Sequence, residues 1–225
     1  MKLMGCLARS ANWLFTLIGA SSLVIVFLSF SHQVVGQEAR SLMTSEPVLS
    51  GMSGVQPGTV RFEGDVQKQW IADVDETEWQ YLVIHHSATR SGSVELIHEQ
   101  HLKRRDTDGN PWLGIGYHFV IGNGQGMADG AIQATFRWKE QIHGAHSGSA
   151  VVNARGIGIC VIGNFENSPP SIAQLKSLKT LVRFLAVRHR ITPENLIGHA
   201  DVKATACPGK HFPLNDVRQV ISATF

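Results

Sequence analysis

Four short apolar segments, each bounded by glycine or by polar residues, set the strongest limit on how this chain can fold. They are YLVIHH at residues 81–86, GYHFVI at 116–121, GIGICVIG at 156–163 and NLIGH at 195–199. Apolar runs of this length are typical of buried β-strands and are too short for core helices. The second run continues into the glycine-rich GNGQG, which predicts a hairpin.

Segments with helical spacing separate or follow these strands, at about residues 93–105, 171–190 and 214–222. Ser93 is the expected N-cap of the first. Ser171 and Gln174 form a capping-box pattern at the start of the second. Apolar residues then recur at helical spacing: Ile172, Leu175, Leu178, Leu181, Val182 and Leu185. Strands interleaved with helices predict the α/β class, as a single domain with a central mixed β-sheet flanked by helices.

The first 36 residues differ in character from the rest. Lys2 and Arg9 precede an uncharged, apolar stretch at 13–30, which predicts a signal peptide or an N-terminal membrane anchor. Small residues at 34–36 would permit cleavage after Gly36, and both alternatives remain open. In either case we expect an exported protein, periplasmic or at the cell surface.

A flexible linker is expected at residues 37–64, which are rich in Gly, Ser, Pro and Gln and lack a helical or strand period. The compact domain should then occupy residues 65–225. The chain carries 20 basic and 18 acidic residues, a net charge of +2, which argues against a nucleic-acid partner. Its one basic cluster, Lys103-Arg104-Arg105, is short, and we expect a solvated helix end there.

Export would permit a disulfide between Cys160 and Cys207. Their contexts differ, because Cys160 lies within the apolar run GIGICVIG, whereas Cys207 lies in the turn TACPG. A buried, unreactive thiol at 160 and a reactive or metal-binding thiol at 207 fit these contexts better than a bridge.

Polar residues stand at the ends of the predicted strands, where a site built on a sheet is usually found. They are His85-His86, Tyr117-His118 and the segment HADVKATACPG at 199–209. A hydrolytic zinc site needs about three protein ligands and one open position, and one histidine of the first pair with His199 and Cys207 would supply that set. Only one of His85 and His86 can join it, because successive strand residues point to opposite faces. From the residues alone, a metal site and histidines satisfied by hydrogen bonds fit equally well.

Several motifs together resemble those of one enzyme family. VIHHSAT, GYHFVI with its glycine turn, HGAH, GIGICVIGNF and IGHADVKATACPG occur in that order. They are similar to the motifs of the zinc-dependent N-acetylmuramoyl-L-alanine amidases of type 2, a family that includes phage lysozyme-type amidases and the peptidoglycan recognition proteins. The similarity covers about residues 81–213, and motifs in a shared order are more specific than any one of them. The resemblance implies the same α/β fold.

The resemblance also implies roles for individual residues. It assigns one zinc ion per chain to His85, His199 and Cys207, and so selects the first histidine of the pair. Tyr117 matches the catalytic tyrosine, whose hydroxyl can hydrogen-bond the developing oxyanion, although a strand tyrosine outside this family more often serves packing. Thr205 falls where relatives carry Lys or Thr, and it is the second expected catalytic residue.

In other respects the sequence matches the family pattern less closely. His146 and Asn153 are the expected substrate contacts, although the segment between them is longer than is common in relatives. Some relatives carry a glutamate on the strand that here reads ICVIG, where Cys160 and Ile162 offer no base. Proton transfer would then depend on water, Tyr117 and the solvent. We expect surface or capping positions for the remaining histidines of the domain, namely His98, His101, His143, His189 and His211.

The implied reaction is hydrolysis of the amide that joins the lactyl group of N-acetylmuramic acid to L-alanine in peptidoglycan. Export agrees with this substrate, because peptidoglycan lies outside the cytoplasmic membrane. One alternative is a recognition module that binds peptidoglycan or muropeptides without cutting them. Another is a closed structural zinc site, to which His86, His118 or Asp201 would add a fourth ligand. The three ligands and the tyrosine favour the enzyme, which we expect to be a monomer.

Overall fold

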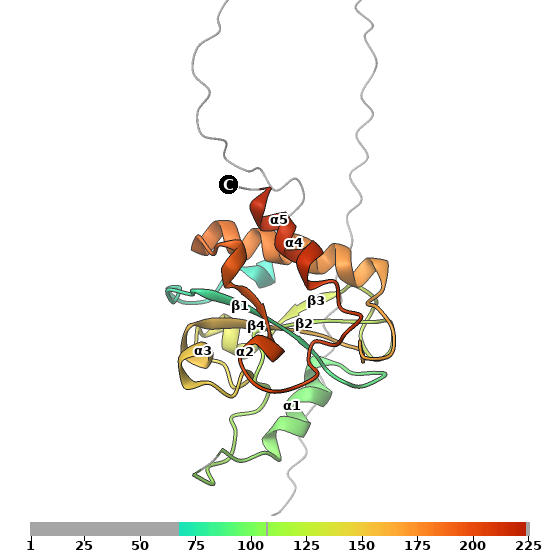
Figure 1. Cartoon of the computed structure of the whole chain (residues 1–225). Coiled ribbons are helices and arrows are strands. Elements are labelled where there is room, and N and C mark those ends of the chain that lie inside the picture. The colour runs from blue at the N-terminus through green and yellow to red at the C-terminus, as the bar shows by residue number, and fades with distance from the viewer. Residues whose placement is uncertain (1–67, 107, 224–225) are drawn as a thin grey trace, which may run out of the picture. The chain divides into compact units, whose positions relative to one another are not determined.

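A five-stranded mixed β-sheet is the frame of the domain (Figure 1). Its strands are β1 Tyr81–His86, β2 Phe119–Ile121, β3 Ile132–Ala134, β4 Gly156–Val161 and β5 Leu196–Gly198. They lie in the order β3-β2-β4-β1-β5, with β2 and β3 antiparallel and the other neighbours parallel. The predicted mixed sheet and the hairpin after GYHFVI are confirmed.

The computed structural model describes residues 68–106 and 108–223, all of which fall in one compact unit. The predicted export segment at 1–36 and the linker at 37–64 lie outside the described residues, as does the predicted start of the domain at residue 65. Within the described ranges, no helix combines the length and the apolar character needed to span a bilayer.

Helices cover both faces of the sheet. They are α1 Val94–Leu102, α2 Phe136–Lys139, α3 Ala150–Arg155, α4 Ile172–His189 and α5 Leu214–Ser222, with short 3-10 turns at Lys68–Trp70, Pro193–Asn195 and His199–Asp201. In Figure 1, α4 and α5 lie on one side of the sheet, and α1 and α3 lie on the other. The predicted caps are present, because Ser93 Oγ accepts a hydrogen bond from the amide of Leu96, and Ser171 and Gln174 form a reciprocal capping box.

The two faces of the sheet carry different side chains. On the side of α4 and α5, Leu82 and Ile84 of β1 pack into the large hydrophobic core. On the other side, Val120 of β2 and Cys160 of β4 belong to a smaller apolar cluster. Because residues alternate along a strand, His85 falls on this second side, level with Cys160 across the β1–β4 ladder. The smaller cluster leaves room on this side for a polar site.

Two apolar residues at the starts of the helices are exposed. Leu96 is 42% exposed and Ile172 is 88% exposed. Both stand in the first turn of their helix, and the buried positions begin with Ile97 in α1 and Gln174 in α4. In both helices, therefore, the apolar residues begin before the first position that the core buries.

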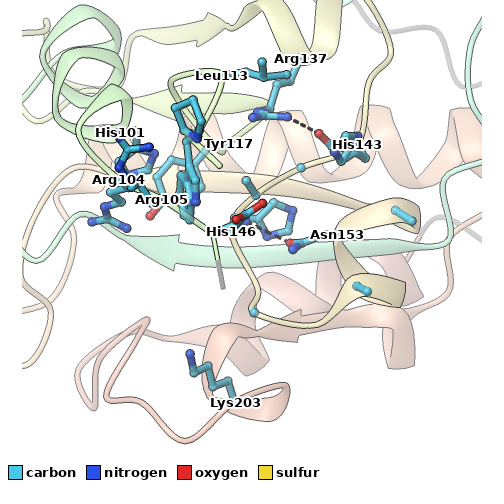
Figure 2. A pocket seen from close by; sticks show the side chains of 18 of the residues that line it. His101, Arg104, Arg105, Leu113, Tyr117, Arg137, His143, His146, Asn153 and Lys203 are labelled. Carbon is cyan, nitrogen blue, oxygen red and sulfur yellow. Dashed lines mark hydrogen bonds between the residues drawn. The ribbon is translucent and has the colours of Figure 1, made fainter. Parts of the chain in front are cut away.

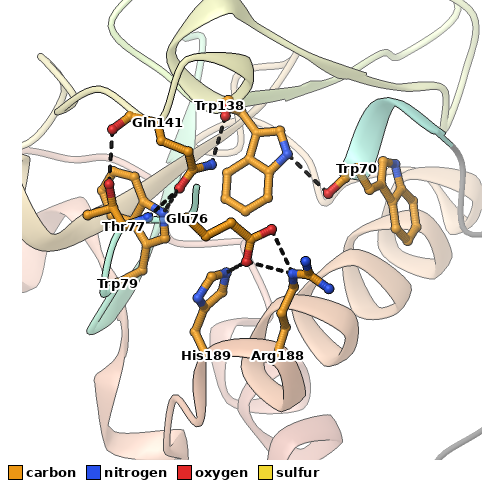
Figure 3. A network of polar contacts seen from close by, with 8 residues as sticks. All are labelled: Trp70, Glu76, Thr77, Trp79, Trp138, Gln141, Arg188 and His189. Atoms are coloured by element: carbon orange, nitrogen blue, oxygen red, sulfur yellow. Dashed lines mark hydrogen bonds and ion pairs between the residues drawn. The ribbon is translucent and has the colours of Figure 1, made fainter. Parts of the chain in front are cut away.

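A network of polar contacts holds the segment before β1 (Figure 3). Its centre is the buried Gln141, whose Oε1 accepts hydrogen bonds from the amide of Thr77 at 2.9 Å and from Nε1 of Trp79 at 2.7 Å. The Nε2 of Gln141 donates to a backbone carbonyl of α2 at 2.7 Å. Both carboxylate oxygens of Glu76 lie within 2.7 Å of Nε of Arg188 in α4. The chain that enters β1 is thus tied to α2 and to α4.

Replacing Gln141 with leucine is expected to lower the free energy of unfolding by about 2–3 kcal/mol, because the buried Nε1–H of Trp79 loses its acceptor. A urea titration followed by tryptophan fluorescence measures the change. Gln80→Leu is the matched control, since Gln80 is exposed and pairs with the exposed Arg155 at 3.3 Å. The control should change stability by less than about 0.5 kcal/mol. Equal losses in the two variants would contradict the central role of Gln141.

Candidate functional site

Three side chains with metal-binding atoms meet at the carboxyl end of β1. His85 lies near the end of that strand, His199 directly follows β5, and Cys207 lies in the loop beyond. Their ligand atoms all lie within 4.8 Å of one another, and Sγ of Cys207 is 3.8 Å from Nδ1 of His85. Because β1 and β5 are parallel neighbours, their carboxyl ends bring the two histidines to the same edge of the sheet.

Hydrogen bonds from two backbone amides, one of them in β1, hold Cys207 beside the end of that strand. The amide of Ala200 donates to the carbonyl of Cys207 at 2.8 Å, which closes the loop, and the amide of His86 donates to Sγ of Cys207 at 3.3 Å. The ring of His86 lies on the other face, where its Nδ1 accepts a hydrogen bond from the amide of Phe165. The structure therefore places His85, rather than His86, with His199 and Cys207.

This donor set fits zinc. Nitrogen and sulfur ligands of one tetrahedral zinc ion lie roughly 3.3–3.6 Å apart, close to the spacing of His85 and Cys207. Burial, with the neighbouring His146 and His199, lowers the pKa of His85 well below its usual range, so the imidazole is neutral and has a free lone pair. Burial raises the pKa of Cys207 to about 11, so an incoming cation must displace the thiol proton.

Two of the residues expected to offer a fourth ligand are engaged elsewhere. Both ring nitrogens of His118 lie at hydrogen-bond distance from backbone atoms, and Asp201 pairs with Arg218 at 3.2 Å. Among residues 68–106 and 108–223, His85, His199 and Cys207 are the one group of His, Cys or carboxylate side chains close enough to hold an ion. This geometry argues against the closed structural site that four ligands would make.

Tyr117 stands beside these three residues. Its ring centroid lies 5.1 Å from that of His85 and 5.6 Å from that of His101. Burial, and then the nearby Cys160 and Cys207, raise the pKa of the Tyr117 hydroxyl well above its usual range. The hydroxyl therefore stays protonated and can donate a hydrogen bond. This placement is compatible with the expected catalytic role, which stays a prediction.

A groove of about 800 Å³ opens in front of the site (Figure 2). Tyr117 and His199 are among its lining residues. Four cations also line it, namely Arg104, Arg105, Arg137 and Lys203. Within the described part of the chain, Asp106 is the one carboxylate that lines the groove, and it already accepts hydrogen bonds from the amide and side chain of Asn110. The groove is therefore positively charged, although the whole chain carries a net charge of only +2.

Thr205 is exposed and is not among the residues that line this groove. Its Oγ1 accepts a hydrogen bond from the amide of Cys207 at 3.3 Å. The hydroxyl proton of Thr205 is not used by that contact, so the expected bond to an oxyanion stays a prediction.

Several groove residues carried little or no signal in the sequence. Arg104 and Arg105, expected at a solvated helix end, are exposed and also line the groove. His101, expected at the surface or in a cap, is buried and lines it as well. Arg137 is buried and donates to two backbone carbonyls, a position that depends on long-range packing. Lys203 lies within HADVKATACPG, and only its place in this motif indicated that it could lie near the site.

His146 and Asn153, the expected substrate contacts, both line the groove. His146 is nevertheless buried, and each of its ring nitrogens already lies at hydrogen-bond distance from a protein atom. Burial lowers the pKa of His146 to about 4, so its ring is neutral. Asn153 Oδ1 accepts hydrogen bonds from the 146–147 segment. Contact of either residue with substrate stays a prediction.

The chain is similar in sequence and structure to several known proteins. A family model described as N-acetylmuramoyl-L-alanine amidase matches residues 75–210. A peptidoglycan-recognition protein of Drosophila simulans is 33% identical over 147 residues, which cover 61% of this chain and 72% of that protein. The solved N-acetylmuramoyl-L-alanine amidase LysC from Clostridium intestinale is 30% identical with a TM-score of 0.54, over 68% of this chain and 93% of that one. Human PGRP-IBETAC, solved in complex with glycosamyl muramyl pentapeptide, is 27% identical with a TM-score of 0.50, over 63% of this chain and 82% of that one.

Proposed function

The chain belongs to the N-acetylmuramoyl-L-alanine amidase family, and from this premise we propose that it is a zinc-dependent amidase that acts on peptidoglycan. It would hydrolyse the amide between the lactyl group of N-acetylmuramic acid and L-alanine. Relatives of this chain include peptidoglycan recognition proteins, so binding without cleavage is the second candidate.

The convergence of His85, His199 and Cys207 beside an open groove carries this proposal. A module that only binds its ligand has no need of three metal-binding side chains. A hydrolytic zinc site needs these three ligands together with one position that remains accessible to water or substrate.

When bound, zinc supplies a Lewis acid that polarises a carbonyl group and lowers the pKa of water from about 15.7 toward 7. The two histidines would hold the ion through neutral nitrogens, and Cys207 would hold it through its thiolate. Tyr117, which stays protonated, can donate a hydrogen bond to the negative oxygen that develops on the amide carbon. Thr205 is the second candidate donor.

The departing amine needs a proton, and few protein groups can supply it. Cys160 and Ile162 of the β4 segment offer no carboxylate, and burial raises the pKa of the Cys160 thiol, which therefore does not act as an acid or base near neutral pH. Asp106 is held in its own turn by Asn110. Burial likewise raises the pKa of the Tyr117 hydroxyl, so we assign delivery of this proton to water in the groove.

The charge of the groove supports a peptidoglycan substrate. Stem peptides carry free carboxylates, which the guanidinium and ammonium groups of Arg104, Arg105 and Lys203 can attract. Export through the N-terminal segment would bring the enzyme to this substrate. The human relative was solved with a muramyl pentapeptide bound, and this ligand belongs to the same chemical class.

Removal of zinc from the purified full-length chain is expected to abolish release of stem peptides from peptidoglycan. The chain would be incubated with peptidoglycan alone, with a chelator, and with a chelator followed by added zinc. New amino-terminal alanine should appear in the first and third samples and be absent from the second. Binding without any release would support the recognition module instead, and release that is insensitive to the chelator would contradict the zinc mechanism.

A further inference from the structure

We propose that His146 and Asn153 position two of the metal ligands, by fixing which ring nitrogen of His85 and of His199 carries the proton. This inference rests on the proposed function, because it concerns the same zinc site. It gives His146 and Asn153 a task in the site that does not require contact with substrate.

The first arm, meaning a series of hydrogen bonds that ends at a metal ligand, runs from β4 through His146 to His85. Nε2 of His146 lies 3.2 Å from the carbonyl oxygen of Gly156, and because a carbonyl only accepts, this nitrogen must carry the proton. Nδ1 of the neutral His146 ring is then an acceptor. It lies 3.0 Å from Nε2 of His85, so this nitrogen of His85 must be the donor. The remaining nitrogen of His85, Nδ1, is left with its lone pair facing Cys207 at 3.8 Å.

The second arm reaches His199. Its Nε2 lies 3.2 Å from the carbonyl oxygen of Ser147, so Nε2 carries the proton and Nδ1 keeps the lone pair. Both histidine ligands therefore present the same nitrogen, and each has its N–H group directed to an acceptor. Hydrogen bonds of this kind orient a ligand and make its free nitrogen more basic.

Asn153 joins the two arms. Its Oδ1 accepts from the amide of His146 at 3.0 Å, from the amide of Ser147 at 2.9 Å and from the hydroxyl of Ser147 at 2.9 Å. These bonds place the ring that supports His85 and the carbonyl that supports His199. A single side chain of α3 thus determines the position of both acceptors.

Two glycines make room for the His146 ring. A Cβ atom on Gly144 would lie 2.3 Å from Cδ2 of that ring, and a Cβ atom on Gly158 of β4 would lie 2.5 Å from the same atom. Any larger residue at either position would displace the imidazole. Gly158 does not have the positive φ that would itself exclude alanine, so Gly158→Ala is a way to move the ring without removing it.

The test compares His146→Phe with His146→Asn in the full-length chain. Phenylalanine removes the acceptor for His85, whereas the amide oxygen of asparagine can replace it. We expect His146→Phe to weaken zinc affinity by about 10–100-fold, measured by competition with a chromophoric chelator, and His146→Asn to restore most of it. Gly158→Ala should weaken affinity in the same direction. His211→Phe, at an exposed histidine, is the matched control and should leave affinity unchanged.

The proton positions are read directly from ring-nitrogen chemical shifts of the zinc-free chain with ¹⁵N-labelled histidine. In the wild type, Nε2 should be protonated on both His85 and His199. In His146→Phe, His85 should become a mixture of tautomers while His199 stays unchanged, and in Asn153→Leu both should become mixtures. A global loss of fold would alter both rings equally in His146→Phe, so the unchanged His199 separates positioning from stability.

Wild-type zinc affinity together with an unaltered His85 tautomer in His146→Phe would overturn this inference and leave the proposed function standing. A wild-type chain that binds no zinc, or binds it without releasing stem peptides, would instead contradict the proposed function. The two failures are distinguishable because zinc affinity and tautomers are measured without substrate.

Discussion

Cys207→Ser is expected to lose zinc and amidase activity together. A thiolate binds zinc strongly, whereas an alcohol keeps its proton at neutral pH and is a weak ligand. Loss of a hydrogen-bond partner of a ligand already lowers metal affinity by about 10–100-fold, so loss of the ligand itself should exceed about 100-fold. Zinc content of the purified chain measures the first effect. Release of amino-terminal alanine from peptidoglycan measures the second, and it should fall to the level of the chelated wild type.

Cys160→Ala is the matched control for this variant. Both cysteines in the described residues are free and buried, and Cys160 lies across the β1–β4 ladder from His85. Its removal deletes a thiol from the same neighbourhood but no proposed ligand, so zinc should bind in the wild-type ratio. Zinc retained by Cys207→Ser, or lost equally from both variants, would show that the ligand assignment is wrong.

The strands and helices could be predicted because their signals are local. The apolar run from Leu82 to Ile84 marks β1, and the capping pair Ser171 and Gln174 marks the start of α4 within one residue. The order of the strands could not be predicted in this way. β4 lies between β1 and β2 although it follows both in the chain, and no pattern within one strand identifies its neighbours.

The site shows the same division between local and long-range information. The apolar run of β1 could not decide between His85 and His86, because both faces of this central strand are buried and its residues do not alternate in polarity. The resemblance to the amidases supplied that choice. The partners of the ligands had no comparable signal, because His146 lies in a loop without periodicity and its hydrogen bonds depend on how Asn153 folds that loop.

Tyr117→Phe is expected to keep zinc but lose most of the turnover. The phenyl ring retains the packing against His85 and His101, so the metal ligands should stay in place. The variant lacks only the hydroxyl that we assign to the developing oxyanion. Removing one such donor from a hydrolytic site typically lowers kcat by about 10²–10³-fold. The kcat for release of amino-terminal alanine should fall by this factor while KM changes little, because the lost bond forms in the transition state.

Tyr81→Phe provides the comparison, since the chain has two tyrosines and Tyr81 lies at the opposite end of β1 from His85. This change should leave both zinc content and kcat at wild-type values. The contrast between the two variants isolates the hydroxyl of Tyr117 from any general effect of exchanging tyrosine for phenylalanine. Full activity of Tyr117→Phe would remove this residue from the mechanism and leave stabilisation of the oxyanion to Thr205 and the metal. Loss of zinc from Tyr117→Phe would instead mean that the hydroxyl supports metal binding rather than turnover.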